Sequence, residues 1–400
     1  MRRALVLFAA FTSVFATSAS AQRQRAIRPP VGVPGAYRPL YLYLDNTLTY
    51  FRNRIDQLPP VQPKDVVFAA ELITANGNRG PDLLTAQALA GVRVNLDALQ
   101  RMGVEGVAVT IVYPEIDSTF PRYREYVAFF KAVASEVRSR RMKLIVKLSV
   151  VFTGTTFANF NVDFSSLTVA KYAAGKRAMA DLILREIEPD YLNLIGEPDT
   201  EAQLTGLREL NDAATYVGVI NTIVTGLDRK QTKIGAGIGT WLPPSFADAF
   251  AGTAIDYVDM HLYPVWPFTL DNAFAIADAS HRKGKQVAMS ETWLYKAGPS
   301  ENGGVAATED IFRRDPFSFW SPLDAKFFRA VVGFAEAERL EFVSPFWSAY
   351  FFGNVTFDAS TATLSYREIS QLANRAAADA MVAGRVTPLG AEYSRLIAGR

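Results

Sequence analysis

The sequence contains no cysteine, and among its 400 residues it has only two histidines, His261 and His281. Disulfide bonds and thiolate metal sites are therefore excluded, and no HExxH spacing typical of a catalytic zinc site occurs. The GxSxG turn that carries a serine nucleophile is also missing, as is a GxGxxG sequence that opens the first helix. We therefore expect chemistry that uses neither a metal ion nor a cofactor.

Charge of one sign is not in excess, since 42 lysines and arginines stand against 40 aspartates and glutamates. The first residues nevertheless have a pattern of their own, with Arg2 and Arg3, an apolar stretch over residues 4 to 16, and small residues at 19 to 21. This pattern is typical of a secretory signal peptide, residues 1–21, which predicts a secreted or periplasmic protein cleaved after Ala21. Cleavage removes two basic residues and brings the net charge from +2 to zero, so we expect no nucleic-acid partner.

Long apolar runs are lacking after this segment, and none reaches the roughly 20 residues that a membrane helix needs, so we expect no membrane insertion. Residues 22–37 are rich in arginine, proline and glycine without apolar periodicity. We interpret them as a linker or mobile N-terminal arm. The remaining residues, 38–400, are then expected to form one domain.

Within this domain, apolar strand candidates alternate with segments of helical periodicity. The strand candidates cover residues 66–73, 104–113, 143–152, 190–196, 233–239, 254–263, 286–291 and 341–350. The helical segments cover 84–103, 123–142, 168–187, 202–227 and a short 243–252, and a long loop is expected over 297–318. Eight such units predict an α/β fold, a single-domain (β/α)8 TIM barrel, whereas an open doubly wound sheet is the alternative.

Two glutamates stand at the ends of predicted strands. Glu197 follows the fourth strand in the sequence GEP, and Glu291 ends the seventh strand in SETW. Each has a structural interpretation, because a carboxylate ahead of a helix is favoured by the helix dipole and a strand end can hold a satisfied polar residue. In a closed barrel, however, both would face the same mouth, where two carboxyl groups can flank one glycosidic bond.

Over roughly residues 60 to 380, these motifs make the sequence resemble clan A of the glycoside hydrolases. Members of this clan are retaining barrel enzymes with an acid/base glutamate after strand four and a nucleophilic glutamate after strand seven. The resemblance implies that Glu197 is the general acid/base and Glu291 the nucleophile. It also implies that Tyr263, in HLYP, hydrogen-bonds the nucleophile and that Trp347 is an aromatic platform beneath the sugar.

The sequence departs from the clan's pattern at two places. Many members have asparagine immediately before the acid/base, where this chain has Gly196. Many also have an arginine near the end of strand two, where this chain has Val112, Tyr113 and Pro114.

Other polar candidates lie at or within predicted strands. His261, at the end of strand six, could bond a sugar hydroxyl, orient a carboxylate or be a structural residue. Glu71, at the end of strand one, could contribute at the floor of the site, and Lys147 is expected to face the barrel interior, where it would need a partner. Asp199 and Asp259 are interpreted as loop or cap residues.

All five tryptophans lie in or just after predicted strands five to eight, and none lies in the first half of the chain. Flat aromatic faces can stack on a sugar ring, although packing beneath long loops is the alternative. We interpret them as the rim of a sugar site, and the predicted substrate contacts are Trp241, Trp266, Trp293 and Trp347.

The sequence thus predicts an exported, monomeric, retaining glycoside hydrolase that cleaves a β-linked oligo- or polysaccharide by double displacement. The spread of tryptophans over several loops favours an endo-acting enzyme. A retaining mechanism predicts carboxyl groups about 5 to 5.5 Å apart. The alternatives are a non-catalytic carbohydrate-binding barrel and a metal-dependent barrel enzyme, which would need carboxylate and histidine ligands grouped at the mouth.

Overall fold

The computed structural model describes residues 32–61, 65–263, 265–301 and 309–398. The predicted signal peptide at 1–21, and the predicted arm as far as residue 31, lie outside these residues. The last residues of the predicted arm pack on the domain, because the ring of Tyr37 lies 5.4 Å from that of Phe319 and 5.6 Å from that of Phe357. No helix among the described residues has the length and apolar character needed to cross a bilayer.

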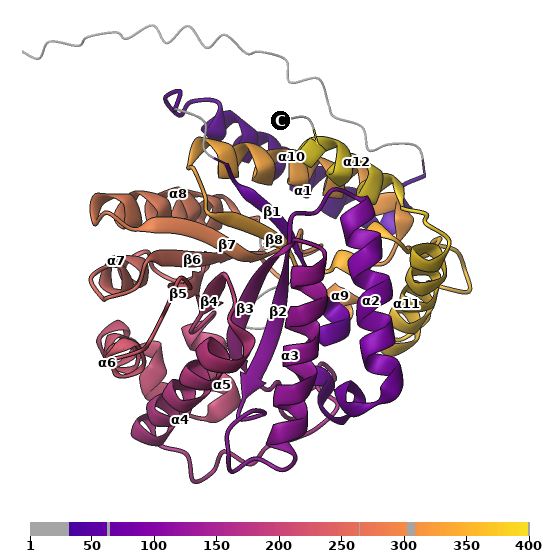
Figure 1. The fold of residues 1–400 in the computed structure, drawn as a ribbon. Helices are drawn as coiled ribbons and strands as arrows, with labels where there is room; N and C mark the ends of the chain where they lie inside the picture. Colours follow the sequence, from indigo (N-terminus) through magenta and orange to yellow (C-terminus); the bar gives the residue numbers. More distant parts are fainter. Residues whose placement is uncertain (1–31, 62–64, 264, 302–308, 399–400) are drawn as a thin grey trace, which may run out of the picture.

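Eight parallel strands close into a barrel in which each strand pairs with its neighbours in sequence, and β8 pairs with β1. The strands are β1 (Val67–Glu71), β2 (Gly106–Tyr113), β3 (Lys143–Val150), β4 (Tyr191–Asn193), β5 (Lys233–Gly239), β6 (Tyr257–Leu262), β7 (Gln286–Thr292) and β8 (Phe342–Pro345). All eight predicted strands are present, so the predicted (β/α)8 barrel is confirmed and the open sheet is excluded. Figure 1 shows the strands at the centre with helices around them.

The helices cover the outside of the barrel. They are α1 (Arg38–Ile55), α2 (Ala86–Arg101), α3 (Tyr123–Ser139), α4 (Val169–Leu182), α5 (Pro198–Thr205), α6 (Ala213–Val224), α7 (Ser245–Ala251), α8 (Pro267–Arg282), α9 (Glu309–Phe312), α10 (Ser321–Ala337), α11 (Tyr366–Val382) and α12 (Pro388–Ala398). Helix α1 lies beside α10 near the C-terminal helix α12 (Figure 1).

The helical segment predicted over 202–227 is two helices and not one. Gly206 ends α5 in a left-handed conformation with φ 77°, which glycine adopts without steric cost. Asp212 then caps α6, because its side chain accepts a hydrogen bond from the backbone N–H of Thr215. The periodicity alone hid this break because apolar residues continue on both sides of it.

At the N-terminal ends of the strands, the barrel interior is filled by side chains that come from strands on every side of the barrel. The rings of Tyr191 and Phe342 lie 4.8 Å apart, and that of Tyr257 lies 5.6 Å from Phe342. The ring of Tyr257 also explains a glycine in β5, since a Cβ on Gly235 would lie 2.0 Å from it. This apolar layer closes the barrel at the N-terminal ends of its strands and leaves the C-terminal ends for a site.

Helix α12 packs closely on the segment that follows β8, the 3-10 turn Ser348–Phe351. A Cβ on Gly390 would lie 2.3 Å from the carbonyl oxygen of Phe351. We predict that Gly390→Ala lowers the free energy of unfolding by about 1 to 3 kcal/mol, because backbone must move to make room. Denaturant unfolding followed by circular dichroism measures this.

The matched control is Gly218→Ala on the exposed face of α6, where a Cβ meets nothing within 4 Å. This change should raise the free energy of unfolding by about 0.5 to 1 kcal/mol through helix propensity. Equal effects of the two substitutions would contradict the packing of α12 described here.

Candidate active site

The structure brings Glu197 and Glu291 together at the C-terminal ends of the strands. One carboxyl oxygen of Glu197 lies within 4.8 Å of one carboxyl oxygen of Glu291. The two side chains keep 17% and 15% of their surface exposed and line a cavity of about 50 Å³. Such a separation fits the short spacing of a retaining glycosidase and is too small for the roughly 6.5 to 9.5 Å of an inverting one.

Glu197 lies between β4 and α5, and Pro198 is the first residue of that helix. Because a residue before proline avoids helical geometry, Glu197 has an extended backbone with φ −142° and ψ 97°. It is the N-cap residue of α5, but its side chain makes no capping hydrogen bond. Its carboxylate instead accepts a hydrogen bond of 2.6 Å from the hydroxyl of Thr200 and turns toward the cavity.

Each carboxyl oxygen of Glu291 contacts a polar side chain. The ammonium group of Lys147 lies 2.7 Å from Oε1, and the hydroxyl of Tyr263 donates to Oε2 at 2.5 Å. Burial alone would raise the pKa of Glu291, but Lys147, His261 and the Tyr263 hydrogen bond outweigh it and hold this pKa below its usual value. Glu291 is therefore ionised and fixed in orientation.

Lys147 faces the barrel interior, as predicted, and its second partner is Glu71, whose Oε2 lies 2.7 Å away. The other oxygen of Glu71 accepts hydrogen bonds from Thr110 at 2.8 Å and Asn76 at 3.2 Å. Glu71 is fully buried beneath Lys147 and does not line the cavity. Glu71 was predicted as a substrate-binding residue at the floor of the site; it does lie beneath the cavity, but its carboxylate pairs with the lysine, so the prediction that it binds substrate is wrong.

His261 orients a carboxylate, which was one of its three predicted roles. Its Nδ1 lies 2.8 Å from Oε1 of Glu197, and its Nε2 lies 3.1 Å from the hydroxyl of Ser290. Asp259 is 3.3 Å from Nε2 and accepts hydrogen bonds from Ser290 at 2.5 Å and Asn193 at 2.6 Å. Burial would lower the pKa of His261, but the neighbouring carboxylates outweigh it and raise this pKa well above its usual value. The ring is thus a cation between acidic groups.

Gly196 allows this position of the histidine. A Cβ on Gly196 would lie 2.8 Å from Cε1 of His261, so a larger side chain would displace the ring. Glycine at this position thus leaves room for the imidazole ring, which comes from β6. The glycine at 196, where many clan members have asparagine, is therefore what allows His261 to contact Glu197.

Asp259 belongs to the site, because it contacts His261 and Ser290, although it was interpreted as a loop or cap residue. Asp199 lies in the first turn of α5, which agrees with that interpretation. Asp259 and His261 alternate along β6, so they lie on one face, and Tyr263 follows at the same spacing just after the strand; this spacing of two was the signal that could have found Asp259. Asp199 follows Glu197 by two residues and accepts a hydrogen bond of 2.8 Å from the indole N–H of Trp241. Burial, and then the charge of Glu197, raise the pKa of Asp199 to about 6.

The tryptophans do not form the predicted rim. Trp293 is 1% exposed and packs on Phe328, so the prediction that it stacks on a sugar is wrong. Trp266 is also buried, so it cannot stack on a sugar either. Trp320 lies in the core with these two tryptophans. These large aromatic side chains lie in the core because their burial removes a large apolar area from water.

Trp241 and Trp347 are partly exposed, but neither lines the cavity. Its aromatic lining comes from Phe152 and Phe346, which the sequence did not single out. The polar lining, apart from the charged groups, comes from Asn76, Asn78, Thr110, Ser149, Asn193 and Thr200.

Glu197, His261 and Glu291 are close enough to share a metal ion, since one donor atom of each lies within 4.8 Å of the others. Their donor set does not fit this use. A histidine ligand must be neutral, whereas the carboxylates around His261 keep it protonated, and Lys147 and Tyr263 already occupy both oxygens of Glu291. The grouping that a metal-dependent barrel enzyme would need is present, but its charges are already balanced by protein groups.

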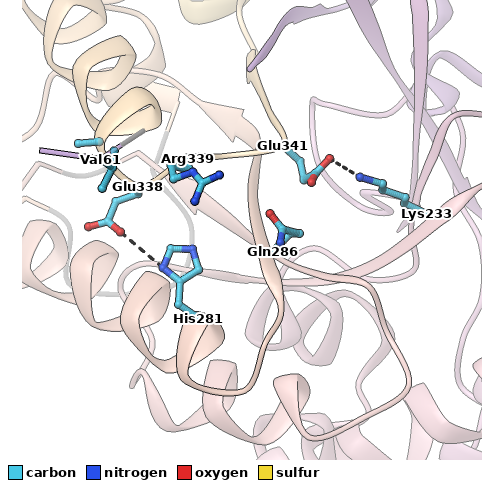
Figure 2. A pocket seen from close by; sticks show the side chains of 8 residues that line it. Val61, Lys233, His281, Gln286, Glu338, Arg339 and Glu341 are labelled. Atoms are coloured by element: carbon cyan, nitrogen blue, oxygen red, sulfur yellow. Dashed lines mark hydrogen bonds and ion pairs between the residues drawn. The ribbon is translucent and has the colours of Figure 1, made fainter. Parts of the chain in front are cut away.

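A second and larger pocket, of about 570 Å³, lies at the opposite end of the barrel. Lys233 and Gln286, which line it, are the first residues of β5 and β7 (Figure 2). Its charges are paired, with Lys233 2.7 Å from Glu341 and His281 3.8 Å from Glu338. Because active sites of such barrels lie at the C-terminal ends of the strands, size does not make this pocket the candidate site.

A buried cluster supports the segment that carries Glu197. The ammonium group of Lys176, on α4, contacts the carboxylate of Glu201 at 2.9 Å and the carbonyl oxygens of Leu148 at 2.9 Å and Leu194 at 3.1 Å. Two tyrosine hydroxyls, from Tyr172 and Tyr216, also donate to Glu201. These contacts tie the ends of β3 and β4 to α5, one turn after Glu197.

We predict that Lys176→Met lowers the free energy of unfolding by about 3 to 5 kcal/mol, because it leaves the buried carboxylate of Glu201 without a cation. Lys171→Met, an exposed position on the same helix, is the control and should change it by less than about 0.5 kcal/mol. Denaturant unfolding of both variants measures the difference. If the two variants have similar free energies of unfolding, the contacts of Lys176 do not stabilise the protein as their burial implies.

Asp199 generates a prediction about pH. Its folded pKa of about 6 lies above the ordinary value of 3.8, so its ionisation destabilises the folded state as pH rises through this range. Asp199→Asn should therefore gain stability relative to the unmodified protein between pH 4 and pH 7.5, by up to roughly 2 to 3 kcal/mol.

Urea unfolding at the two pH values measures the gain in the Asp199→Asn protein. The same comparison in a Glu197→Gln background should give a smaller gain, since the charge of Glu197 is part of the cause. A stability difference that does not change with pH would contradict the raised pKa of Asp199.

No family model and no curated protein sequence matches the chain. Among solved structures, the fold is similar to that of an exo-beta-1,4-mannosidase from Opitutaceae bacterium strain TAV5, with a TM-score of 0.52 and 14% identity over 84% of this chain and 60% of that one. It is also similar to the AHE enzyme from Alicyclobacillus herbarius, with a TM-score of 0.51 and 12% identity over 85% and 98% of the two chains. The chain thus spans 60% of the length of the mannosidase, and the likeness at these identities is one of fold.

Proposed function

We propose that the protein is a retaining glycoside hydrolase of the clan A type, which cleaves a β-linked oligo- or polysaccharide with Glu291 as nucleophile and Glu197 as general acid/base. The observation that carries this proposal is the pair of carboxyl groups within 4.8 Å, one of which is held ionised by Lys147 and Tyr263. Two carboxyl groups at this distance can act on opposite sides of one glycosidic bond.

The environments of the two glutamates suit different steps. In the first step, Glu291 attacks the anomeric carbon while Glu197 gives its proton to the leaving oxygen, which forms a glycosyl ester on Glu291 and releases the sugar alcohol. Negative charge then develops on Glu197, and the ring N–H of His261, whose Nδ1 lies 2.8 Å from Oε1, stabilises it by a hydrogen bond. In the second step, Glu197 removes a proton from water, the water oxygen attacks the anomeric carbon, and Glu291 leaves as a carboxylate.

The substrate class is proposed from two lines of support. Beside its ionisable groups, the cavity is lined by six neutral amide and hydroxyl side chains and two phenylalanine rings, which can contact the hydroxyl groups and the apolar face of a sugar. The mannosidase of similar fold is named for β-1,4-linked mannose, which favours a β-linked substrate. The sequence pattern at 1–21, which predicts a signal peptide, favours action outside the cytoplasm. Endo action and a monomeric state stay predictions, which product sizes and light scattering measure.

The test is the variant Glu291→Gln, assayed with the unmodified protein on a panel of β-mannans, β-glucans and aryl β-glycosides. We expect kcat to fall on the order of 10⁴-fold or more, as when one member of a catalytic unit is removed. Glu209→Gln, at an exposed position after α5, is the matched control and should keep full turnover.

The anomeric form of the first product, followed by NMR, should show retention of configuration. Full turnover of Glu291→Gln would refute the nucleophile assignment, and inverted product would refute the double displacement. Binding of a glycan by calorimetry without any product would instead identify a carbohydrate-binding barrel. Activity that a chelator abolishes would favour the metal-dependent alternative.

A further inference from the structure

Lys147 occupies an unusual place for a cation. It lies in the middle of β3, in register with Thr110 on β2 and Asn193 on β4, and its side chain is 3% exposed. The ammonium group crosses the barrel interior to reach Glu71 on β1 and Glu291 on β7, at 2.7 Å from each. The ring of Phe346 lies 4.8 Å from it and shields it from water.

This lysine is not suited to be a nucleophile. Burial alone would lower the pKa of Lys147, but Glu291 and Glu71 outweigh it and raise this pKa above its usual value. An amine that forms a Schiff base needs the opposite, a pKa lowered by an apolar or cationic environment. Contacts of 2.7 Å to Glu71 and to Glu291 instead place the ammonium group between two carboxylates.

The proposed double displacement explains why Lys147 has a second carboxylate partner, Glu71. While Glu291 is ionised, it neutralises Lys147. Once Glu291 becomes a glycosyl ester it is neutral, and a buried ammonium ion without a partner costs several kcal/mol. Glu71 does not take part in the bond changes, and it accepts hydrogen bonds from Thr110 and Asn76 that hold it in place.

We propose that Lys147 is a positioning residue that holds Glu291 ionised and aimed for attack, and that Glu71 is its standing counterion, which keeps the ammonium ion paired while Glu291 is an ester. This inference rests on the proposed function for the role of Glu291.

The charge of Glu291 depends on all the ionisable groups that face it. They come from β1, β3, the β4–α5 connection, β6 and the segments after β6 and β7, and they are Glu71, Lys147, Glu197, Asp259, His261, Tyr263 and Tyr295. Lys147 contacts Glu291 and Glu71, and Glu71 contacts Lys147, Thr110 and Asn76, whereas the side-chain contacts of Glu197 are with His261 and Thr200. Removal of Lys147 or Glu71 should therefore change Glu291 without changing proton donation by Glu197.

The test compares the pH profiles of kcat/KM on an aryl β-glycoside for two variants that remove opposite charges. Lys147→Met should lower kcat roughly 10²-fold and move the acidic limb to higher pH, because Glu291 loses its cation. Glu71→Gln should move the same limb to lower pH, because an anion near Glu291 is lost. It should also slow formation of the glycosyl-enzyme, which leaves Lys147 unpaired.

Two further variants keep the test independent of folding. Lys147→Arg retains the charge and should restore the acidic limb of the unmodified protein. The double variant Glu71→Gln with Lys147→Met removes one charge of each sign, so it leaves no uncompensated ion beyond Glu291. The acidic limb of its pH profile should lie between the limbs of the unmodified protein and of Lys147→Met. Circular dichroism confirms that each variant is folded.

A readout without turnover separates this inference from the proposed function. In protein labelled with ¹³C at the glutamate carboxyl carbon, the signal lost in Glu291→Gln belongs to Glu291, and its titration should shift upward in Lys147→Met and downward in Glu71→Gln. If no glycoside is cleaved but these shifts occur, the proposed function fails and the pairing stands. If glycosides are cleaved but the two variants shift the limb and the titration in the same direction or leave them unchanged, the inference is overturned.

Discussion

Closure of the parallel sheet imposes the constraint on which the rest of this structure depends. Every inward side chain of a closed barrel shares one interior with inward side chains from the other strands, and water cannot solvate a charge there. A charged residue that points inward must therefore find its partner on another strand. Lys147 on β3, Glu71 on β1 and Glu291 on β7 satisfy this requirement together.

The same constraint divides the interior into two ends of opposite character. At the N-terminal ends of the strands, Tyr191, Tyr257 and Phe342 fill the interior with rings, and the glycine at 235 leaves the space that Tyr257 occupies. At the C-terminal ends, inward positions are acidic, basic or hydrogen-bonding. The apolar layer supports the polar one and keeps water from reaching it from below, which strengthens each charge interaction above it.

The two candidate catalytic glutamates are distinguished by the cations they meet. Glu291 contacts a lysine that is paired on its far side, whereas Glu197 contacts a histidine that is itself paired with Asp259. Each carboxylate thus has a cation, and each cation has a second anion behind it. Within the described residues, Gly196 is the local feature that permits the second arrangement, because any side chain there would occupy the space of the imidazole ring.

The sequence by itself determined the barrel and the meeting of Glu197 with Glu291, because alternating strands and helices allow few topologies and parallel strands end at one face. It also placed Lys147 inside the barrel. Tertiary structure alone decided that Asp259 belongs to the site, that Glu71 pairs with Lys147 beneath the cavity, and that Trp293 is buried while Phe346 lines the cavity. These outcomes depend on which side chains from distant strands compete for the same interior space, and periodicity along one strand carries no information about that competition.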